Sequence, residues 1–210
     1  MGFQEDIRIM RESYYELERR FIEINRIIPF DNSGDTYSPR LYDILQTTCG
    51  QVENMLRLIC DEMQSPCGNN PGFPKYYETL NSTGILERQI IDYFSSSLTC
   101  KPFFVEPDQK SPFWWRSYNK TKHNLPQGYK EGNLTNTVFA LSGAYALHCI
   151  AEYCKHAHQE ILNNSEWMDE DAISMRTLQP TITTQWIKED VRPRSDVFYP
   201  VSYYRPLGGL

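Results

Sequence analysis

The segment from about residue 133 to 162 constrains the fold more than any other part of the sequence. Between Val138 and Ile150 it reads VFALSGAYALHCI, in which almost every side chain is apolar or small. A helix without a polar face has to be buried on most of its sides. Its smallest residues would let neighbouring helices approach closely: Ala140, Ser142, Gly143, Ala144 and Ala146. The sequence therefore predicts a central helix that is surrounded by other elements.

Two long amphipathic helices are expected before this segment. From about residue 4 to 28, apolar side chains recur at spacings of three and four, which is the period of one helix face. The second helix begins at Ser38-Pro39, an N-cap residue followed by proline at the first helical position. Its apolar face continues to Met63, and the prolines and glycines that follow predict its end.

Shorter helices complete the expected bundle. One is predicted at about 75–81 and another at about 84–97, with Ile85, Ile90, Ile91 and Phe94 as its apolar set. Ser111-Pro112 repeats the signal of a cap residue followed by proline and opens the stretch FWWRSYNKTKH. Pro126 and Gly128 follow soon afterwards, so this helix is expected to end near His123.

The chain changes character after residue 162. Helical periodicity is lost, and prolines are scattered among stretches such as TITTQWI and VFYPVSYY. We therefore expect an all-α fold: a four- to five-helix bundle over residues 1–162, followed by an irregular, extended C-terminal arm over residues 163–210. The arm is expected to pack on the bundle or on a partner subunit.

Composition and charge restrict the class of protein. The net charge of −6 argues against a surface that grips nucleic acid everywhere, although it is compatible with a local basic cleft. The first residues are charged from position 5 and predict no secretory signal, and no apolar run reaches the roughly 18 residues of a membrane span. A cytoplasmic protein without membrane contact is expected. Its six cysteines should then be reduced and mostly buried.

The helix over residues 113–123 has two different sides. Its aromatic side is expected to anchor it to the bundle and carries Trp114, Tyr118 and Thr121. The opposite side presents a guanidinium, an amide, an ammonium and an imidazole in one row: Arg116, Asn119, Lys120 and His123. Such a row suits RNA cleavage through the 2′-hydroxyl. Histidine can move a proton near neutral pH, and arginine suits phosphate oxygens in the charged transition state.

The stretch WWRSYNKTKHN, followed by the small-residue helix TNTVFALSGAYALHCI, resembles HEPN-type domains. In particular it is similar to a bacterial branch with a Tyr-Asn-x-x-Lys-His helix. The resemblance implies a four- to five-helix bundle, commonly dimeric. The catalytic members of the family are metal-independent ribonucleases of toxin–antitoxin and phage-defence systems. Their motif is Arg, four to six residues, then His, and the two motifs of a dimer meet in a cleft.

Arg116 and His123 match this motif with six residues between them. In the tighter form of the motif, aligned on Asn119 and His123, the arginine position is occupied by Tyr118. The resemblance implies Arg116, Asn119 and His123 as catalytic residues. Lys120 and Lys122 are expected to contact the substrate.

The expected partners are RNA, a second copy of the chain and a protein encoded in the same operon; no cofactor is expected. Two functions stay open. The first is a metal-independent endoribonuclease or an RNA-binding protein. The second is a non-catalytic interaction or scaffold module, for which the same residues form a solvated helix face.

A metal site is a weaker alternative. Cys154 and His158 lie one helical turn apart, and Cys149 and His156 are close in sequence, but no Cys-x-x-Cys pair or second ligand cluster accompanies them. We therefore expect reduced core cysteines rather than metal ligands. His148, inside the apolar segment, is expected to be a hydrogen-bonded core residue.

Overall fold

The computed structural model describes residues 2–63, 67–68, 71–82, 84–93, 96–123, 125–164, 195 and 197–200. Its helices are α1 (Phe3–Asn25), α2 (Pro39–Glu62), α3 (Phe73–Asn81), α4 (Phe113–His123), α5 (Leu125–Gly128) and α6 (Leu134–Asn164). Two 3-10 turns, η1 (Phe30–Asn32) and η2 (Tyr129–Glu131), lie between them. The strands are β1 (Ile91–Tyr93), β2 (Thr99–Cys100) and β3 (Phe198–Pro200). The fold is thus mostly helical, and the small sheet is a feature that the all-α expectation lacked.

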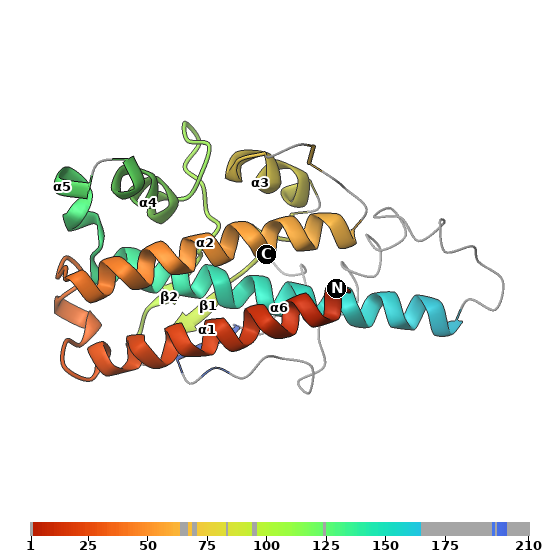
Figure 1. Cartoon of the computed structure of the whole chain (residues 1–210), viewed down its shortest axis with the longest axis horizontal. Coiled ribbons are helices and arrows are strands. Elements are labelled where there is room, and N and C mark those ends of the chain that lie inside the picture. Colours follow the sequence, from red (N-terminus) through yellow and green to blue (C-terminus); the bar gives the residue numbers. More distant parts are fainter. Residues whose placement is uncertain are drawn as a thin grey trace, which may run out of the picture.

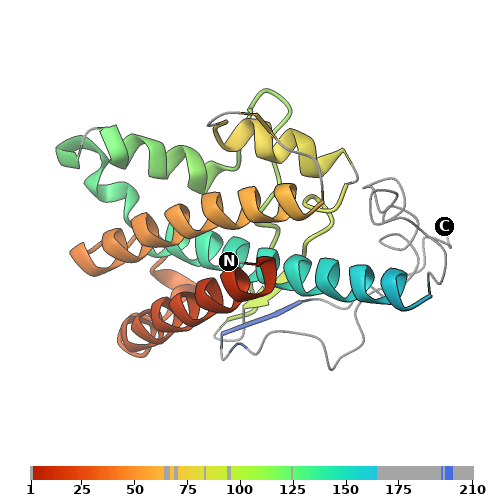
Figure 2. The same ribbon diagram turned by 45° about the vertical axis from the view of Figure 1, so that its right-hand side comes forward.

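The long helices α1, α2 and α6 lie side by side along the longest axis of the molecule (Figure 1). Helices α3 and α4 cover the outer side of α2, and the small sheet lies against α1 and α6 on the opposite side (Figure 2). This arrangement places α4 at the surface, above both α2 and α6.

Helix α6 is the predicted central helix. Of the 19 residues from Leu134 to Glu152, 89% are buried inside the protein. This stretch also has the length and apolar composition of a membrane span, but a buried core helix has the same properties. Its small residues allow the close approach that the sequence suggested, since Gly143 faces Trp114 of α4 and Pro102.

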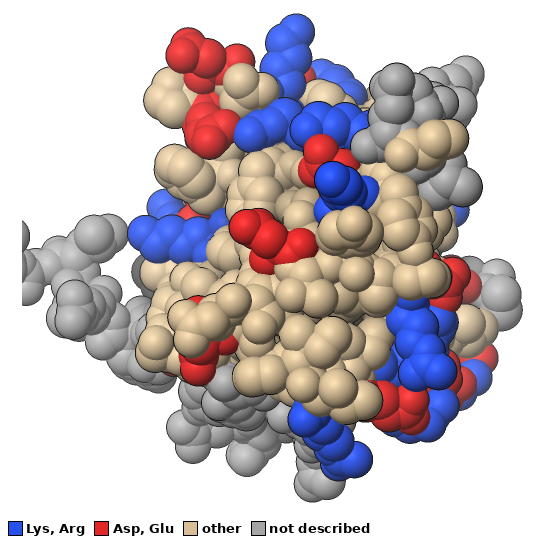
Figure 3. All heavy atoms as spheres, turned by 90° about the vertical axis from the view of Figure 1, so that its left-hand side faces the viewer, with Lys and Arg blue, Asp and Glu red and all other residues tan. Residues whose placement is uncertain are grey.

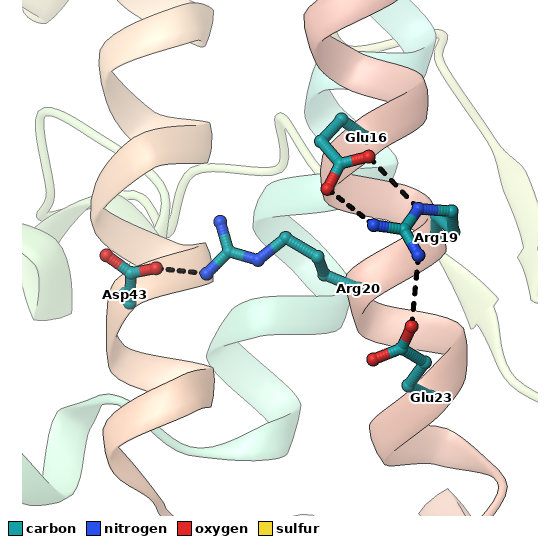
Figure 4. A network of polar contacts seen from close by, with 5 residues as sticks. All are labelled: Glu16, Arg19, Arg20, Glu23 and Asp43. Carbon is teal, nitrogen blue, oxygen red and sulfur yellow. Dashed lines mark hydrogen bonds and ion pairs between the residues drawn. The ribbon is translucent and has the colours of Figure 1, made fainter.

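The start of α2 follows the predicted capping pattern. The side chain of Ser38 accepts a hydrogen bond from the backbone N–H of Leu41, and Pro39 is the first helical residue. On the outer surface, Arg20 of α1 pairs with Asp43 of α2, and Arg19 pairs with Glu16 and Glu23 of its own helix (Figure 4). These exposed ion pairs contribute little stability, so the buried apolar faces hold α1 against α2.

The helix predicted at about 84–97 is wrong. Residues after Gly84, whose φ is +69°, form a turn, and Ile91–Tyr93 form strand β1. β1 pairs antiparallel with β2 and with β3, in the order β2-β1-β3. Burial alternates along β1, with Ile91 and Tyr93 inside, which is the period of a strand. The adjacent β-branched residues Ile90 and Ile91 are compatible with a helix or a strand. Pairing with β2 and β3 makes this segment a strand.

Strand β3 comes from the predicted C-terminal arm and pairs with β1 of the same chain. Val197 and Phe198 are buried, and the ring of Phe198 stacks on Tyr145 of α6 with centroids 6.2 Å apart. The hydroxyl of Ser195 accepts hydrogen bonds from the backbone N–H groups of Val197 and Phe198 and contacts the buried carboxylate of Glu18 in α1. The other residues of the arm beyond Asn164 lie outside the described residues.

His148 is buried in the core, as expected, but no residue that the structure describes supplies the predicted hydrogen bond. Within the described part of the chain neither ring nitrogen has a hydrogen-bond partner. The ring lies 5.3 Å from the ring of Tyr14. Burial, together with the nearby charge of Arg11, lowers the pKa of His148 to about 3. The histidine is therefore neutral at physiological pH.

Candidate functional site

The aromatic side of α4 is fixed by the core. Trp114 is fully buried, and Trp115, Tyr118 and Thr121 are at most 7% exposed. The indole N–H of Trp114 donates a hydrogen bond to the carbonyl of Pro102 at 2.6 Å. The ring of Trp115 stacks on Phe73 of α3, with centroids 4.4 Å apart. The expected anchoring side of this helix is thereby confirmed.

A polar contact with α2 also fixes the position of α4. The side-chain amide of Gln46 contacts the hydroxyl of Thr121, which itself donates to the carbonyl of Tyr118 at 2.6 Å. Thr121 is only 1% exposed, so the bridge lies between the two helices rather than in solvent. It limits rotation of α4 about its own axis, because a buried donor or acceptor that loses its partner costs about 1–3 kcal/mol.

Arg116 lies at the edge of the exposed side and already has two partners. One Nη donates to the carbonyl of Ser111 at 2.7 Å, and the other donates to the carboxylate of Glu106 at 2.7 Å. The side chain of Arg116 is 30% exposed, whereas that of Glu106 is 57% exposed. The guanidinium therefore ties the preceding loop to the first turn of α4, and a phosphate would have to compete with Glu106 for it.

Lys120 is exposed and pairs with Glu131 of η2, with 2.9 Å between Nζ and Oε1. Burial by itself raises the pKa of Glu131. Hydrogen bonds from Lys120, Ser117 and Asn136 outweigh this effect, and the pKa lies below its usual value. The carboxylate is therefore ionised at neutral pH and neutralises Lys120.

Asn119 and Lys122 complete the exposed surface of α4. Both side chains are exposed, and the ammonium of Lys122 lies 5.7 Å from the ring centroid of Tyr118. Burial raises the pKa of the Tyr118 hydroxyl, so this residue stays neutral. His123 is the last residue of α4, and its side chain lies outside the described residues. Arg116, Asn119 and Lys120 thus lie on the outer side of one helix.

Two carboxylates beside this row were not anticipated from the sequence. Glu106 precedes α4 in a loop, and Glu131 follows it in η2. Neither lies at a helical spacing from its partner, so no sequence pattern connects them to Arg116 or Lys120. Together they neutralise two of the three Lys and Arg side chains on α4.

The face of the molecule at the end where α4 and α5 lie carries dispersed charge. In Figure 3, Lys and Arg side chains stand in separate groups next to Asp and Glu, without a continuous basic surface on this face. One recess of about 550 Å³ is lined by Asn32–Tyr37. A second, of about 430 Å³, is lined by residues of α1 and α6. Neither of these two recesses is lined by a residue of α4.

No family model, curated protein or solved structure matches this chain. Among the residues that the structure describes, no group of three or more His, Cys, Asp or Glu side chains could hold a metal ion. Cys149 and Cys154, two of the metal ligands considered from the sequence, are buried thiols. The side chains of His156 and His158 lie outside the described residues.

Proposed function

We propose that this chain is a HEPN-like, metal-independent ribonuclease that binds RNA along α4 and acts as a homodimer in a bacterial defence or toxin–antitoxin system. The supporting observation is the division of α4 into a rigid, buried aromatic side and an exposed polar side. A helix held in this way presents Asn119, Lys120 and Lys122 at fixed positions to a ligand. The cytoplasm is the proposed compartment.

The proposed roles follow from the chemistry of each group. His123 moves a proton from or to the 2′-hydroxyl, and Arg116 stabilises the negative charge that develops on the phosphate. Asn119 orients the scissile phosphate by hydrogen bonding. Lys120 and Lys122 contact backbone phosphates. The ion pair with Glu106 holds the guanidinium of Arg116 until an RNA phosphate displaces that carboxylate.

A second subunit would supply the other wall of an enclosed site. Asn119, Lys120 and Lys122 are exposed on the outer side of a single helix, whereas catalysis needs a site that surrounds the substrate and excludes water. Two copies of α4 facing each other across a two-fold axis would form a cleft between them. The mass of the purified protein in solution, measured by light scattering, tests this part of the proposal.

The direct test is RNA degradation by the purified protein in the presence of a chelator. His123→Ala and Asn119→Ala are compared with the wild-type chain and with Lys75→Ala, a matched surface variant whose exposed lysine pairs with Glu78 of its own helix α3. Loss of at least tenfold in rate for the two α4 variants, with Lys75→Ala unchanged, supports the nuclease. Equal rates in all four proteins, or no turnover in any, remove it.

Glu106→Gln provides a test of Arg116 that leaves the arginine in place. The amide keeps the size of the side chain but removes the charge that neutralises Arg116. If the guanidinium binds phosphate, the variant should bind RNA several-fold more tightly, because the competing carboxylate is gone. Unchanged RNA affinity in the variant would argue that Arg116 serves only to fasten the loop before α4.

A second candidate function is a non-catalytic interaction module that binds a protein encoded in the same operon. The ion pairs Arg116–Glu106 and Lys120–Glu131 favour it, because they neutralise charges that a phosphate would need. Phe104 lies two residues before Glu106 in the loop that precedes α4. It is 59% exposed and could insert into the surface of a partner protein. This alternative predicts a stoichiometric complex with the partner that Phe104→Ala weakens, together with no RNA turnover.

A further inference from the structure

Two cysteines lie in contact at the end of α2 that faces α3. The Sγ atoms of Cys60 and Cys67 are 3.6 Å apart, and Sγ of Cys67 also lies 3.2 Å from the hydroxyl of Thr79 in α3. Both residues are thiols rather than halves of a disulfide. This contact is independent of α4 and of the function proposed for it.

The separation of the two sulfurs is close to what a disulfide requires. An S–S bond is about 2.05 Å long, so the sulfurs would have to approach each other by roughly 1.6 Å. Cys60 is held in the last turn of α2, whereas Cys67 lies between α2 and α3, outside both helices. Gly68, directly after Cys67, has a φ of +81°. The loop residue rather than the helix is therefore the part that would move.

The two thiols differ in accessibility. Cys60 is 1% exposed, whereas Cys67 is only half-buried. Burial, followed by the neighbouring Cys67 and Asp61, raises the pKa of the Cys60 thiol. A small reagent therefore reaches Cys67 first, and Cys60 reacts afterwards with whatever is attached to Cys67.

We propose that Cys60 and Cys67 form a reversible disulfide, with a low-molecular-weight disulfide such as oxidised glutathione as the oxidant. The Cys67 thiolate attacks one sulfur of the reagent, which forms a mixed disulfide and expels the first small thiolate. Cys60 then attacks Sγ of Cys67, forms the internal S–S bond and expels the second small thiolate. Each of the two cysteine thiols loses one proton, and each of the two expelled thiolates takes up one, so the protons balance. The two cysteines are oxidised and the small disulfide is reduced to two thiols.

The position of the bond suggests its effect on the structure. It would fasten the segment after α2 to the end of that helix and close a short ring. It would also break the contact between Cys67 and Thr79, which joins this segment to α3. Because α3 carries Phe73, the ring stacked on Trp115, oxidation acts next to the support of α4 without touching its exposed side.

Peptide mapping tests the proposal on the full wild-type chain. Trypsin releases Leu58–Lys75 as one peptide that contains both cysteines. The folded protein is incubated with mixtures of reduced and oxidised glutathione, alkylated, and digested without reductant. The expected result is a peptide lighter by two hydrogen atoms, with neither cysteine alkylated, which reductant restores. Full alkylation of Cys67 at every ratio, or the bond forming only in denaturant, would overturn it.

Two variants test the order of the steps. In Cys60→Ala the reaction should stop at the mixed disulfide, so glutathione stays attached to the Leu58–Lys75 peptide. In Cys67→Ser the same peptide should carry neither glutathione nor an internal bond. Cys49→Ala, a fully buried cysteine of the same helix, is the matched control and should leave the Cys60–Cys67 bond unchanged. Rapid attachment of glutathione to Cys60 in Cys67→Ser would contradict the assigned roles.

Discussion

Gly143 of α6 lies directly against the indole ring of Trp114 in α4: a Cβ on residue 143 would come within 3.2 Å of Cζ2. The contact sets the distance between the central helix and the helix that carries the candidate site. Trp114 is fully buried and its indole N–H is bonded to Pro102, so the ring has little freedom to move away. The absence of a side chain at residue 143 is therefore part of what positions α4.

Gly143→Ala should be less stable than the same change at Gly50. Alanine is favoured over glycine within a helix by about 0.5–1 kcal/mol, and Gly50→Ala should show that gain because its Cβ would meet nothing within 4 Å. At residue 143 the contact with Trp114 should cancel the gain and lower the free energy of unfolding by about 1 kcal/mol relative to Gly50→Ala. Urea denaturation of the two variants measures this. Equal stabilisation by both would mean that the ring yields freely.

Ser195→Ala should loosen strand β3. The hydroxyl accepts from two backbone N–H groups and contacts the buried carboxylate of Glu18, and alanine leaves all three without it. We expect a loss of about 1–3 kcal/mol in the free energy of unfolding. Hydrogen exchange at the Phe198 amide should become much faster, whereas amides in the middle of α6 should change less. Ser195→Thr keeps a hydroxyl and is the control; if it exchanges as fast as the alanine variant, the hydroxyl is not what holds the strand.

The neutral, buried His148 should make the protein sensitive to acid. The pKa is lowered to about 3 in the folded state, against an ordinary value near 6.5. Protonation therefore favours the unfolded chain, and this stability is complete above about pH 6.5 and falls as the pH drops towards 3. Between pH 7 and pH 5 the loss should be about 2 kcal/mol.

His148→Phe should remove that dependence. Phenylalanine keeps a ring against Tyr14 and has no nitrogen that needs a partner, so stability at pH 7 should rise by about 1 kcal/mol. Denaturant unfolding of wild type and variant at pH 7 and pH 5 makes the comparison. A parallel decline in both proteins would assign the acid sensitivity to other groups.

The exposed residues of α4 should be dispensable for folding, in contrast to Arg116. Asn119→Ala and Lys122→Ala remove side chains that are exposed, so each should change the free energy of unfolding by less than about 0.5 kcal/mol. Arg116→Ala breaks the bonds to Ser111 and Glu106 and should cost about 1–3 kcal/mol. Thermal unfolding of the three variants distinguishes them. A large loss in Asn119→Ala would assign that residue a structural role instead.

The helices could be predicted because their information is local. Ser38-Pro39 marks the start of α2, and the period of apolar residues in α1 and the apolar core of α6 each determine one element without reference to the rest. The segment at 84–97 failed for the opposite reason. Ile90 and Ile91 fit a helix or a strand, and one of the two strands that pair with Ile91 lies at residues 198–200. No short stretch of the sequence contains both β1 and this distant strand.

The candidate site divides in the same way. The two sides of α4 follow from the 3.6-residue period, so the burial of Trp114 and the exposure of Asn119 could be predicted. The pairing of Arg116 with Glu106 could not, because it depends on the path of the loop before the helix. The same limit applies to His148. The burial of His148 follows from its apolar neighbours in the sequence. That no described residue bonds to its ring nitrogens depends on which side chains of α1 pack against it.

The pairing of β3 with β1 has a consequence for biosynthesis. All the helices that the structure describes, together with β1 and β2, precede residues 198–200 in the chain and are synthesised first. For the time needed to translate the intervening stretch of about a hundred residues, one edge of β1 has no partner in its own chain. An open strand edge is a template for other chains, so nascent protein is exposed to aggregation through this edge during the interval. Completion of the sheet, not of the helical bundle, is then the event that ends the vulnerable period of each new molecule.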